Sequence, residues 1–149
     1  MSTIGHQLSG HIRVRVEAVL VTAGNIVAGE AKRSINKSPR GGTYQKRKNS
    51  NGTYRTVKAS APFESPANDL GFLVRSIQTE PDMQNLRMRI LSLHSIAPYA
   101  KSLEYGDMSR GLQPRPFMYK ALQAKSAKAT SIIQKALNQA VRDMNGARP

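Results

Sequence analysis

Hydrophobic residues recur at steps of three and four near both ends of the chain, and this spacing predicts a long helix at each end. The first series runs from Ile12 to Ala31 and predicts a helix over residues 11–35. The second includes the stripe from Ala129 to Met144 and predicts a helix over residues 116–144. Each series is longer than an ordinary strand, so we interpret both as amphipathic helices that bury one face.

Two shorter stretches between these helices are predicted as strands, residues 73–80 and residues 85–93. In the second stretch, apolar and basic side chains alternate with the period of a strand. The Pro81–Asp82 pair that separates them is typical of a turn, so the two strands should form an antiparallel hairpin. The predicted fold class is α+β, a small antiparallel sheet packed against a long N-terminal and a long C-terminal helix within one domain, 1–149.

The segment between the predicted hairpin and the second long helix contains a short predicted helix, followed by glycine and proline residues that end it and start the next helix. Ala97, Ala100 and Leu103 share one face of a short helix predicted over residues 97–105. Gly106 suits the position just past the end of that helix, because glycine adopts a left-handed backbone at little cost. Pro114 and Pro116 exclude helix at Arg115, and Pro116 suits the first position of the long helix that follows. We predict that Leu103, Tyr105 and Phe117 form a small apolar cluster that docks this segment onto the start of the long helix.

Positive charge is the strongest compositional signal of the chain. The 149 residues include 23 Lys and Arg against 9 Asp and Glu, a formal net charge of +14, which is typical of proteins that contact polyanions. No acidic residue lies between Glu30 and Glu64. The predicted polyanion contacts in this region are Lys37, Arg40, Lys46, Arg47, Lys48, Arg55 and Lys58.

Residues 36–60 around these cations are rich in Gly, Ser, Asn and Thr, and we predict a basic flexible loop there. Tyr44 and Tyr54 lie among the cations and could stack against the bases of a single strand. The alternative is a solvated, mobile insertion whose charge aids solubility or packs against an acidic neighbouring subunit. Charge alone leaves both interpretations open.

The sequence carries no recognisable catalytic or metal-binding motif. There is no cysteine, which excludes disulfides and thiolate sites. His6, His11 and His94 lack the spacing of a metal site, and no phosphate-binding loop or nucleophile motif occurs. Glu104 and Asp107 lack further catalytic partners, and Glu104 is expected to pair with Arg115. We therefore expect no enzymatic activity and no cofactor. No apolar run approaches the length of a membrane span, so we expect a soluble protein.

Two ordered blocks of sequence resemble a known family, the tail-component proteins of long-tailed bacteriophages, also called tail-completion or head–tail joining proteins. The first block is similar to this family's Tyr-Ala, Leu-Glu-Tyr-Gly and Arg-Pro-Phe series, and its residues are Tyr99, Ala100, Leu103, Glu104, Tyr105, Gly106, Arg115, Pro116, Phe117 and Ala121. The second block, residues 60–77, resembles the family's Ser-Ala-Pro segment. It departs from that pattern at Phe63, where the family often carries glycine, and at Leu70.

The resemblance implies a structural virion protein of the phage neck or upper tail, present as a ring, here expected to be hexameric, around the DNA channel. Its subunit contacts would involve the segment from Tyr99 to Phe117 and the C-terminal helix. The implied partners are further copies of the chain and other phage neck, portal-adaptor or tail proteins, with weak non-specific contact to phage DNA and no membrane. The implied location is the virion, after assembly in the bacterial host cytoplasm.

A second hypothesis of a different class does not depend on the resemblance. It is a small, basic nucleic-acid-binding protein that uses residues 32–58. The oligomeric state and the affinity for nucleic acid separate the two hypotheses.

Overall fold

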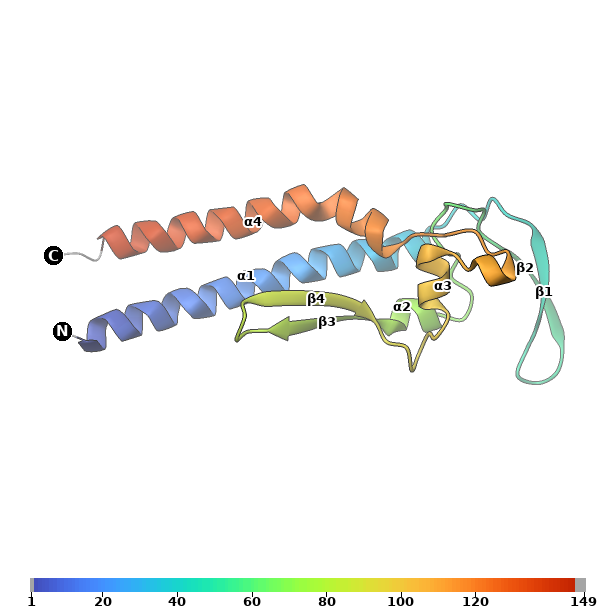
Figure 1. Cartoon of the computed structure of the whole chain (residues 1–149), viewed down its shortest axis with the longest axis horizontal. Helices are drawn as coiled ribbons and strands as arrows, with labels where there is room; N and C mark the ends of the chain where they lie inside the picture. The colour runs from blue at the N-terminus through green and yellow to red at the C-terminus, as the bar shows by residue number, and fades with distance from the viewer. Residues whose placement is uncertain (1, 147–149) are drawn as a thin grey trace.

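The computed structural model describes the backbone of residues 2–146 and the side chains of residue 10 and residues 12–146. Two long helices dominate it, α1 (Ser2–Asn36) and α4 (Met118–Gly146). They lie side by side and run in opposite directions, so that both termini lie at one end of the molecule (Figure 1). At 1.5 Å per residue, α1 alone is about 52 Å long.

The smaller elements lie between the two long helices in sequence. They are β1 (Tyr44–Lys48), β2 (Tyr54–Lys58), α2 (Phe72–Ser76), β3 (Ile77–Asp82), β4 (Arg87–Ser92), α3 (Ala100–Tyr105) and the single-turn 3-10 helix η1 (Met108–Arg110). The strands form two separate antiparallel pairs, β1 with β2 and β3 with β4. The β3–β4 hairpin packs along α1, whereas β1–β2 lies at the end of the molecule away from the termini (Figure 1).

The predicted α+β class and the two long helices are confirmed, although their bounds differ. The N-terminal helix begins at Ser2 rather than at residue 11, and α4 begins at Met118 rather than at Pro116. The predicted antiparallel hairpin is confirmed as β3–β4, which packs against α1, and β1–β2 is a second sheet that the sequence did not predict.

The predicted strand 73–80 is wrong in its first half, because residues 72–76 form the short helix α2 and the strand begins at Ile77. The Ser76 hydroxyl donates a hydrogen bond to the Leu73 carbonyl oxygen (2.7 Å), which closes one helical turn. Leu73, Ser76 and Ile77 are all buried. A short apolar run of this kind is compatible with either a helix or a strand, so its period did not separate them.

The predicted flexible loop over residues 36–60 contains the β1–β2 hairpin instead. Its turn is held by the Asn49 N–H, which donates to the Thr53 carbonyl oxygen (2.7 Å), and by the Asn51 side chain, which accepts from the Thr53 N–H (3.1 Å). Gly52 has a left-handed backbone (φ 83°). The Asn51–Gly52 pair is a strong hairpin signal, and the high polarity of the surrounding residues obscured it.

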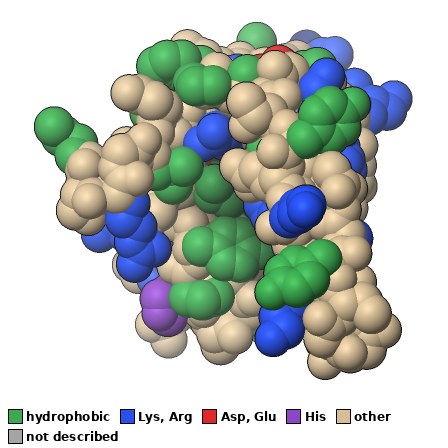
Figure 2. Space-filling model, turned by 90° about the vertical axis from the view of Figure 1, so that its right-hand side faces the viewer, with side chains coloured by type: hydrophobic (Ala, Val, Ile, Leu, Met, Phe, Trp, Pro, Cys, Tyr) green, Lys and Arg blue, Asp and Glu red, His purple; other side chains and the backbone are tan. Residues whose placement is uncertain are grey.

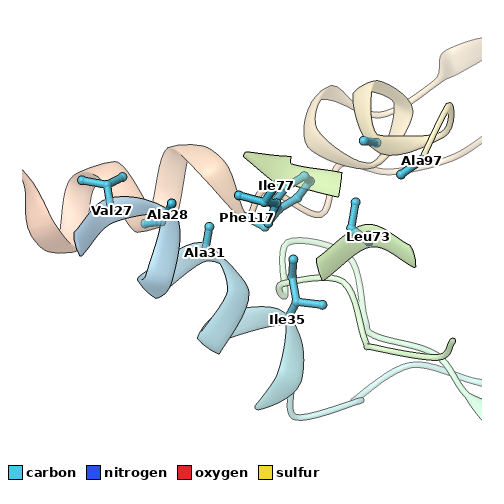
Figure 3. Packing of buried hydrophobic residues seen from close by; sticks show 10 residues of the cluster. Val27, Ala28, Ala31, Ile35, Leu73, Ile77, Ala97 and Phe117 are labelled. Carbon is cyan, nitrogen blue, oxygen red and sulfur yellow. The ribbon is translucent and has the colours of Figure 1, made fainter. Parts of the chain in front are cut away.

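The hydrophobic core lies around the C-terminal half of α1, at the end of the molecule that carries the short elements (Figure 3). Its buried members are Val27, Ala28, Ala31, Ile35, Leu73, Ile77, Ala97, Ala100, Phe117 and Ala121. Phe117 is the largest of the fully buried side chains, with 1% of its surface exposed. The many alanines allow the helices to approach closely, and the Phe117 ring is the largest side chain that fills this core.

Two polar contacts fix the register of α4 on α1. Lys125 of α4 lies 3.3 Å from the Glu30 carboxylate, which Arg33 also binds (Nε to Oε2, 3.0 Å). Arg15 and Asp143 form a second ion pair near the termini. The hydrogen bond from Arg33 is the largest cause that lowers the pKa of Glu30 below its usual value. The charged form of Glu30 is therefore the form that stabilises this contact.

Gly24 explains how the β3–β4 hairpin can lie directly on α1. A Cβ atom added at Gly24 would lie 2.3 Å from Cγ of Met88 in β4, closer than atoms can pack. Gly29 lies little more than one turn further along the same helix, and a Cβ atom there would meet nothing within 4 Å. The glycine at position 24 is therefore required by packing, whereas the one at 29 only weakens the helix.

We predict opposite effects for alanine at these two positions. Gly29→Ala should raise the free energy of unfolding by about 0.5–1 kcal/mol, because alanine is the better helix former. Gly24→Ala gains the same propensity but must displace Met88, so overpacking of about 1–3 kcal/mol should leave the protein less stable. Urea unfolding of the two variants tests this, and Met88→Ala should rescue Gly24→Ala only. Equal stabilisation by both substitutions would contradict the close packing.

Candidate functional site

The end of the molecule away from the termini carries the residues that the sequence singled out. Figure 2 shows this face, on which hydrophobic and basic side chains lie together around a hollow, with little acidic surface in view. The β1–β2 hairpin, the segment 60–73, and α3 with the start of α4 contribute to it. We describe these parts in turn.

The β1–β2 hairpin has two chemically different faces, because side chains alternate along each strand. The outward face consists of six exposed side chains: Tyr44, Lys46, Lys48, Tyr54, Thr56 and Lys58. The inward face consists of Gln45, Arg47, Arg55 and Val57, of which Arg55 and Val57 are half-buried. The strands thus separate three lysines from two arginines.

Asp69 anchors the inward face of the hairpin to the body of the protein. Its carboxylate accepts a hydrogen bond from Arg55 (2.8 Å) and another from Arg47 (3.1 Å). Directly opposed arginines repel each other across a strand pair, and Arg47 and Arg55 are such a pair. The shared carboxylate offsets this repulsion and fixes the hairpin.

The base of the hairpin is held by Glu64. Its carboxylate accepts hydrogen bonds from the backbone N–H groups of Ala61 (2.7 Å) and Gly41 (2.8 Å). These bonds favour the charged form and lower the pKa of Glu64, with the Ala61 N–H as the largest cause. A Cβ atom at Gly41 would lie 2.5 Å from the Glu64 carboxylate, so a larger residue there would displace this carboxylate from its present position.

A hollow of about 410 Å³ lies between the hairpin and α3. Its apolar lining includes Val57, Leu70, Phe72, Leu73, Leu103 and Leu112. Its polar lining includes Arg40, Arg47, Lys58, Asp69, Tyr99 and Arg115. Burial raises the pKa of the Tyr99 hydroxyl above its usual value. The hollow combines an apolar wall with a largely cationic rim.

The predicted polyanion contacts do not form one surface. Lys46, Lys48 and Lys58 lie on the outward face of the hairpin, whereas Arg47 and Arg55 bind Asp69. The other two predicted contacts also lie apart from the outward face. Arg40 donates to the Asn68 carbonyl oxygen (2.6 Å), and Lys37 lies one residue beyond the end of α1.

Glu104 does not pair with Arg115, and this prediction is wrong. The Glu104 carboxylate accepts hydrogen bonds from three backbone N–H groups at the start of α4, those of Phe117 (2.8 Å), Met118 (3.0 Å) and Tyr119 (2.9 Å). The first N–H groups of a helix have no partner within the helix, and a carboxylate there also complements the helix dipole. Glu104 therefore caps α4 from α3.

Arg115 has a different structural role. Its backbone N–H donates to the Leu103 carbonyl oxygen (2.6 Å), and its guanidinium donates to the carbonyl oxygens of Ser60 (3.1 Å) and Gln113 (3.1 Å). It thus joins α3 to the segment that follows the β1–β2 hairpin. Gly106 ends α3 with φ 80°, and a Cβ atom there would lie 2.8 Å from the Leu112 carbonyl oxygen, so glycine is required.

The other motif residues divide between core and surface. Phe117 is buried and Leu103 packs against the core, as predicted. Tyr105 is 76% exposed, so its predicted place in an apolar cluster with these two residues is wrong. Tyr99 is partly exposed at the hollow, and Pro116 lies directly before Phe117. The motif is therefore mainly a structural junction between α3 and α4.

Asp69, Glu64 and Phe63 were not singled out by their chemistry in the sequence. Asp69 and Glu64 are the only acidic residues between Glu30 and Glu80. Their position beside a long basic run is the one feature of the sequence that could have indicated their structural role. Phe63 is exposed (60%) and has a left-handed backbone (φ 64°). This conformation is a genuine outlier for a bulky residue and could not be read from residue types.

Among the side chains that the structure describes, no group of three or more His, Asp or Glu is arranged to hold a metal ion. His94 is exposed, while the side chains of His6 and His11 lie outside the described residues. None of the helices in the described part of the chain is both long and apolar enough to cross a membrane.

Comparison with known proteins gives no relative to this chain: no family model matches it, and no curated protein or solved structure is significantly similar to it.

We predict that the Glu104 cap is a major contribution to stability. Glu104→Ala should lower the free energy of unfolding by about 1–3 kcal/mol, because it leaves three backbone N–H groups without their acceptor. Glu104→Gln keeps an acceptor but loses the charge, so its free energy of unfolding should lie between those of the unchanged protein and Glu104→Ala. The control is Glu80→Ala, an exposed carboxylate whose loss should cost no more than about 0.5 kcal/mol. Equal effects of Glu104→Ala and Glu80→Ala in urea unfolding would contradict the cap.

Proposed function

We propose that this chain is a non-enzymatic structural protein of a tailed bacteriophage, a component of the head–tail connector, neck or upper tail. In this proposal, copies of the chain form a ring, hexameric by analogy, around the DNA channel and contact other neck, portal-adaptor or tail proteins. The protein would assemble in the cytoplasm of the bacterial host and function in the virion. The resemblance of residues 60–77 and 99–121 to tail-component proteins suggests this class, and the surface of the chain supports it.

The observation that carries the proposal is the amount of exposed surface. The chain exposes 10249 Å², whereas a compact monomer of its mass, 16.4 kDa, exposes about 7,500 Å². The excess of about 2,700 Å² is as large as the area that permanent subunit interfaces bury. A chain that leaves so much surface uncovered is suited to assembly with further subunits.

The exposed hydrophobic residues support the same conclusion. Those at or near the hairpin end include Tyr44, Tyr54, Phe63, Leu70, Phe72 and Tyr99. Large exposed apolar patches on soluble proteins commonly mark sites of interaction with other molecules. A closed ring needs two different surfaces on each subunit that fit each other, and the hollow with its apolar wall is a candidate for one of them.

The motif residues fit a structural rather than a chemical role. Glu104 and Arg115 use their charged groups within the subunit, so neither is free to act on a substrate. Phe63 gives a more specific point of agreement. It stands where the resembling family often carries glycine, and its left-handed backbone is the conformation that favours glycine.

The alternative function is that of a small nucleic-acid-binding protein that acts outside a virion. The observation that favours it is the outward face of the β1–β2 hairpin, on which tyrosines and lysines are exposed together. In that case the protein should stay monomeric or dimeric and bind nucleic acid tightly at physiological salt.

Light scattering and native mass measurement test the structural proposal. We expect a hexamer-like ring, or a monomer that enters a larger complex when it is co-expressed with products of the neighbouring genes. Those genes should encode a portal, capsid or tail-tube protein. A chain that remains monomeric alone and with every neighbouring gene product, in a genome region without virion genes, would contradict the proposal.

We further predict that Phe63 contributes to assembly at the expense of subunit stability. Phe63→Gly should raise the free energy of unfolding of the isolated subunit by about 1 kcal/mol, because a left-handed backbone costs other residues about 1–2 kcal/mol. The same variant should assemble less well, because it lacks the exposed ring. Phe63→Ala is the matched control: it also removes the ring but keeps the strained backbone, so it should impair assembly without raising stability. Normal assembly of both variants would show that Phe63 is not an interface residue.

A further inference from the structure

The outward face of the β1–β2 hairpin is an exposed surface that carries positive charge only. Its six side chains are Tyr44, Lys46, Lys48, Tyr54, Thr56 and Lys58. The register places Lys58 opposite Tyr44, Lys46 opposite Thr56 and Lys48 opposite Tyr54. No lysine faces another lysine directly across the strands, so the like charges are spread over the ribbon.

The three lysines are available to an external partner. Among the described residues, no carboxylate lies within 4 Å of Lys46, Lys48 or Lys58. Lys58, at the end of β2, also borders the hollow at the base of the hairpin; it lies over the Tyr44 ring, with Nζ 5.8 Å from the ring centroid, and is exposed. The hairpin arginines differ, because both bind Asp69 on the opposite face.

A second copy of the chain is poorly suited to neutralise this face. Of the nine carboxylate side chains, all except Glu80 already accept a hydrogen bond or form an ion pair within the subunit. The complementary negative charge must therefore come largely from a different molecule.

The residue types favour nucleic acid over an acidic protein. Protein interfaces are enriched in arginine, whose planar group binds carboxylates in a two-pronged manner, but both hairpin arginines are engaged internally. Lysine acts as a point charge and suits phosphates approached from different directions. A two-stranded ribbon also has the width that the major groove of B-DNA admits, about 12 Å.

We propose that the outward face of the β1–β2 hairpin binds the phosphate backbone of double-stranded DNA through Lys46, Lys48 and Lys58, without reading the base sequence. This deepens the proposed function and rests on it, since it names the surface of the subunit that meets the genome. It also separates the cations that bind DNA from Arg47 and Arg55, which hold the hairpin in place.

The test compares two triple variants of the full chain that lose the same charge. The first, K46A/K48A/K58A, removes the lysines of the outward face. The control, K101A/K128A/K135A, removes three exposed lysines of α3 and α4. Fluorescence anisotropy measures the affinity of each variant, and of the unchanged chain, for a mixed-sequence duplex and for one of its single strands at several salt concentrations.

We expect weak duplex binding by the unchanged chain, with a dissociation constant above micromolar at near-physiological salt. Three neutralised phosphates contribute about −2.7 to the slope of log affinity against log salt, or about a forty-fold loss between 50 and 200 mM salt. The hairpin variant should lose this contribution and bind at least ten-fold more weakly at low salt. The control variant should keep both the slope and most of the affinity.

Three results would overturn the proposal. The first is an equal loss in both triple variants, which would mean that net charge rather than this face determines binding. The second is a single strand preferred more than ten-fold, with the preference removed by Tyr54→Ala, which would assign the face to unpaired bases. The third is binding of poly-L-glutamate, but not of duplex, that depends on the three lysines, which would assign it to an acidic protein.

Mass measurement on the same samples keeps this inference separate from the proposed function. Normal assembly of the hairpin variant together with lost duplex binding supports both. Normal assembly with unchanged duplex binding overturns only the DNA-binding face. A chain that never assembles, yet loses duplex binding only in the hairpin variant, overturns the structural role and leaves the nucleic-acid contact established.

Discussion

The contact on which the hairpin end depends is the capping of α4 by Glu104. A single carboxylate on α3 accepts three backbone N–H groups at the start of α4, and this joins two helices that are separated by the Gly106–Pro114 loop. Because α4 starts there, Phe117 is directed into the core. Arg115, held beside the cap, then binds the segment that follows the β1–β2 hairpin. The position of the candidate interaction surface thus follows from one half-buried polar junction.

Acidic residues are far fewer than basic ones, and the two kinds of charge have different roles in this protein. Nearly all of the carboxylates are used to fix the structure: Glu30 between the long helices, Glu64 at the base of the hairpin and Asp69 behind it. The arginines tend to be their partners. The surplus lysines remain exposed, and three of them lie together on one face of a ribbon that the acidic residues hold from behind. The excess positive charge is therefore exposed at the surface rather than neutralised within the subunit.

Long-range periodicity made the two long helices and the α+β class predictable, because those patterns extend over many turns. Glycine and proline chemistry likewise predicted the end of α3 at Gly106. The β1–β2 hairpin was missed because its strands are polar on both faces, which removes the alternation on which strand prediction depends. The roles of Glu104, Arg115 and Asp69 were not predictable, since each acts on groups that only the tertiary fold brings near. The strained backbone of Phe63 leaves no trace in the sequence other than the departure from glycine in the resembling family.

The distribution of the core implies a gradient of local stability along the molecule. Buried hydrophobic residues cluster around the C-terminal half of α1, whereas Leu137, Val141 and Met144, on the part of α4 near the termini, are exposed. There the long helices are supported mainly by each other, and a helix pair with little buried surface opens easily. The hairpin end, by contrast, is held by the core, the Glu104 cap and the Asp69 contacts. In the proposed assembly, the surface that contacts other proteins would lie on this stiff end, and a neighbouring subunit would support the exposed apolar residues near the termini.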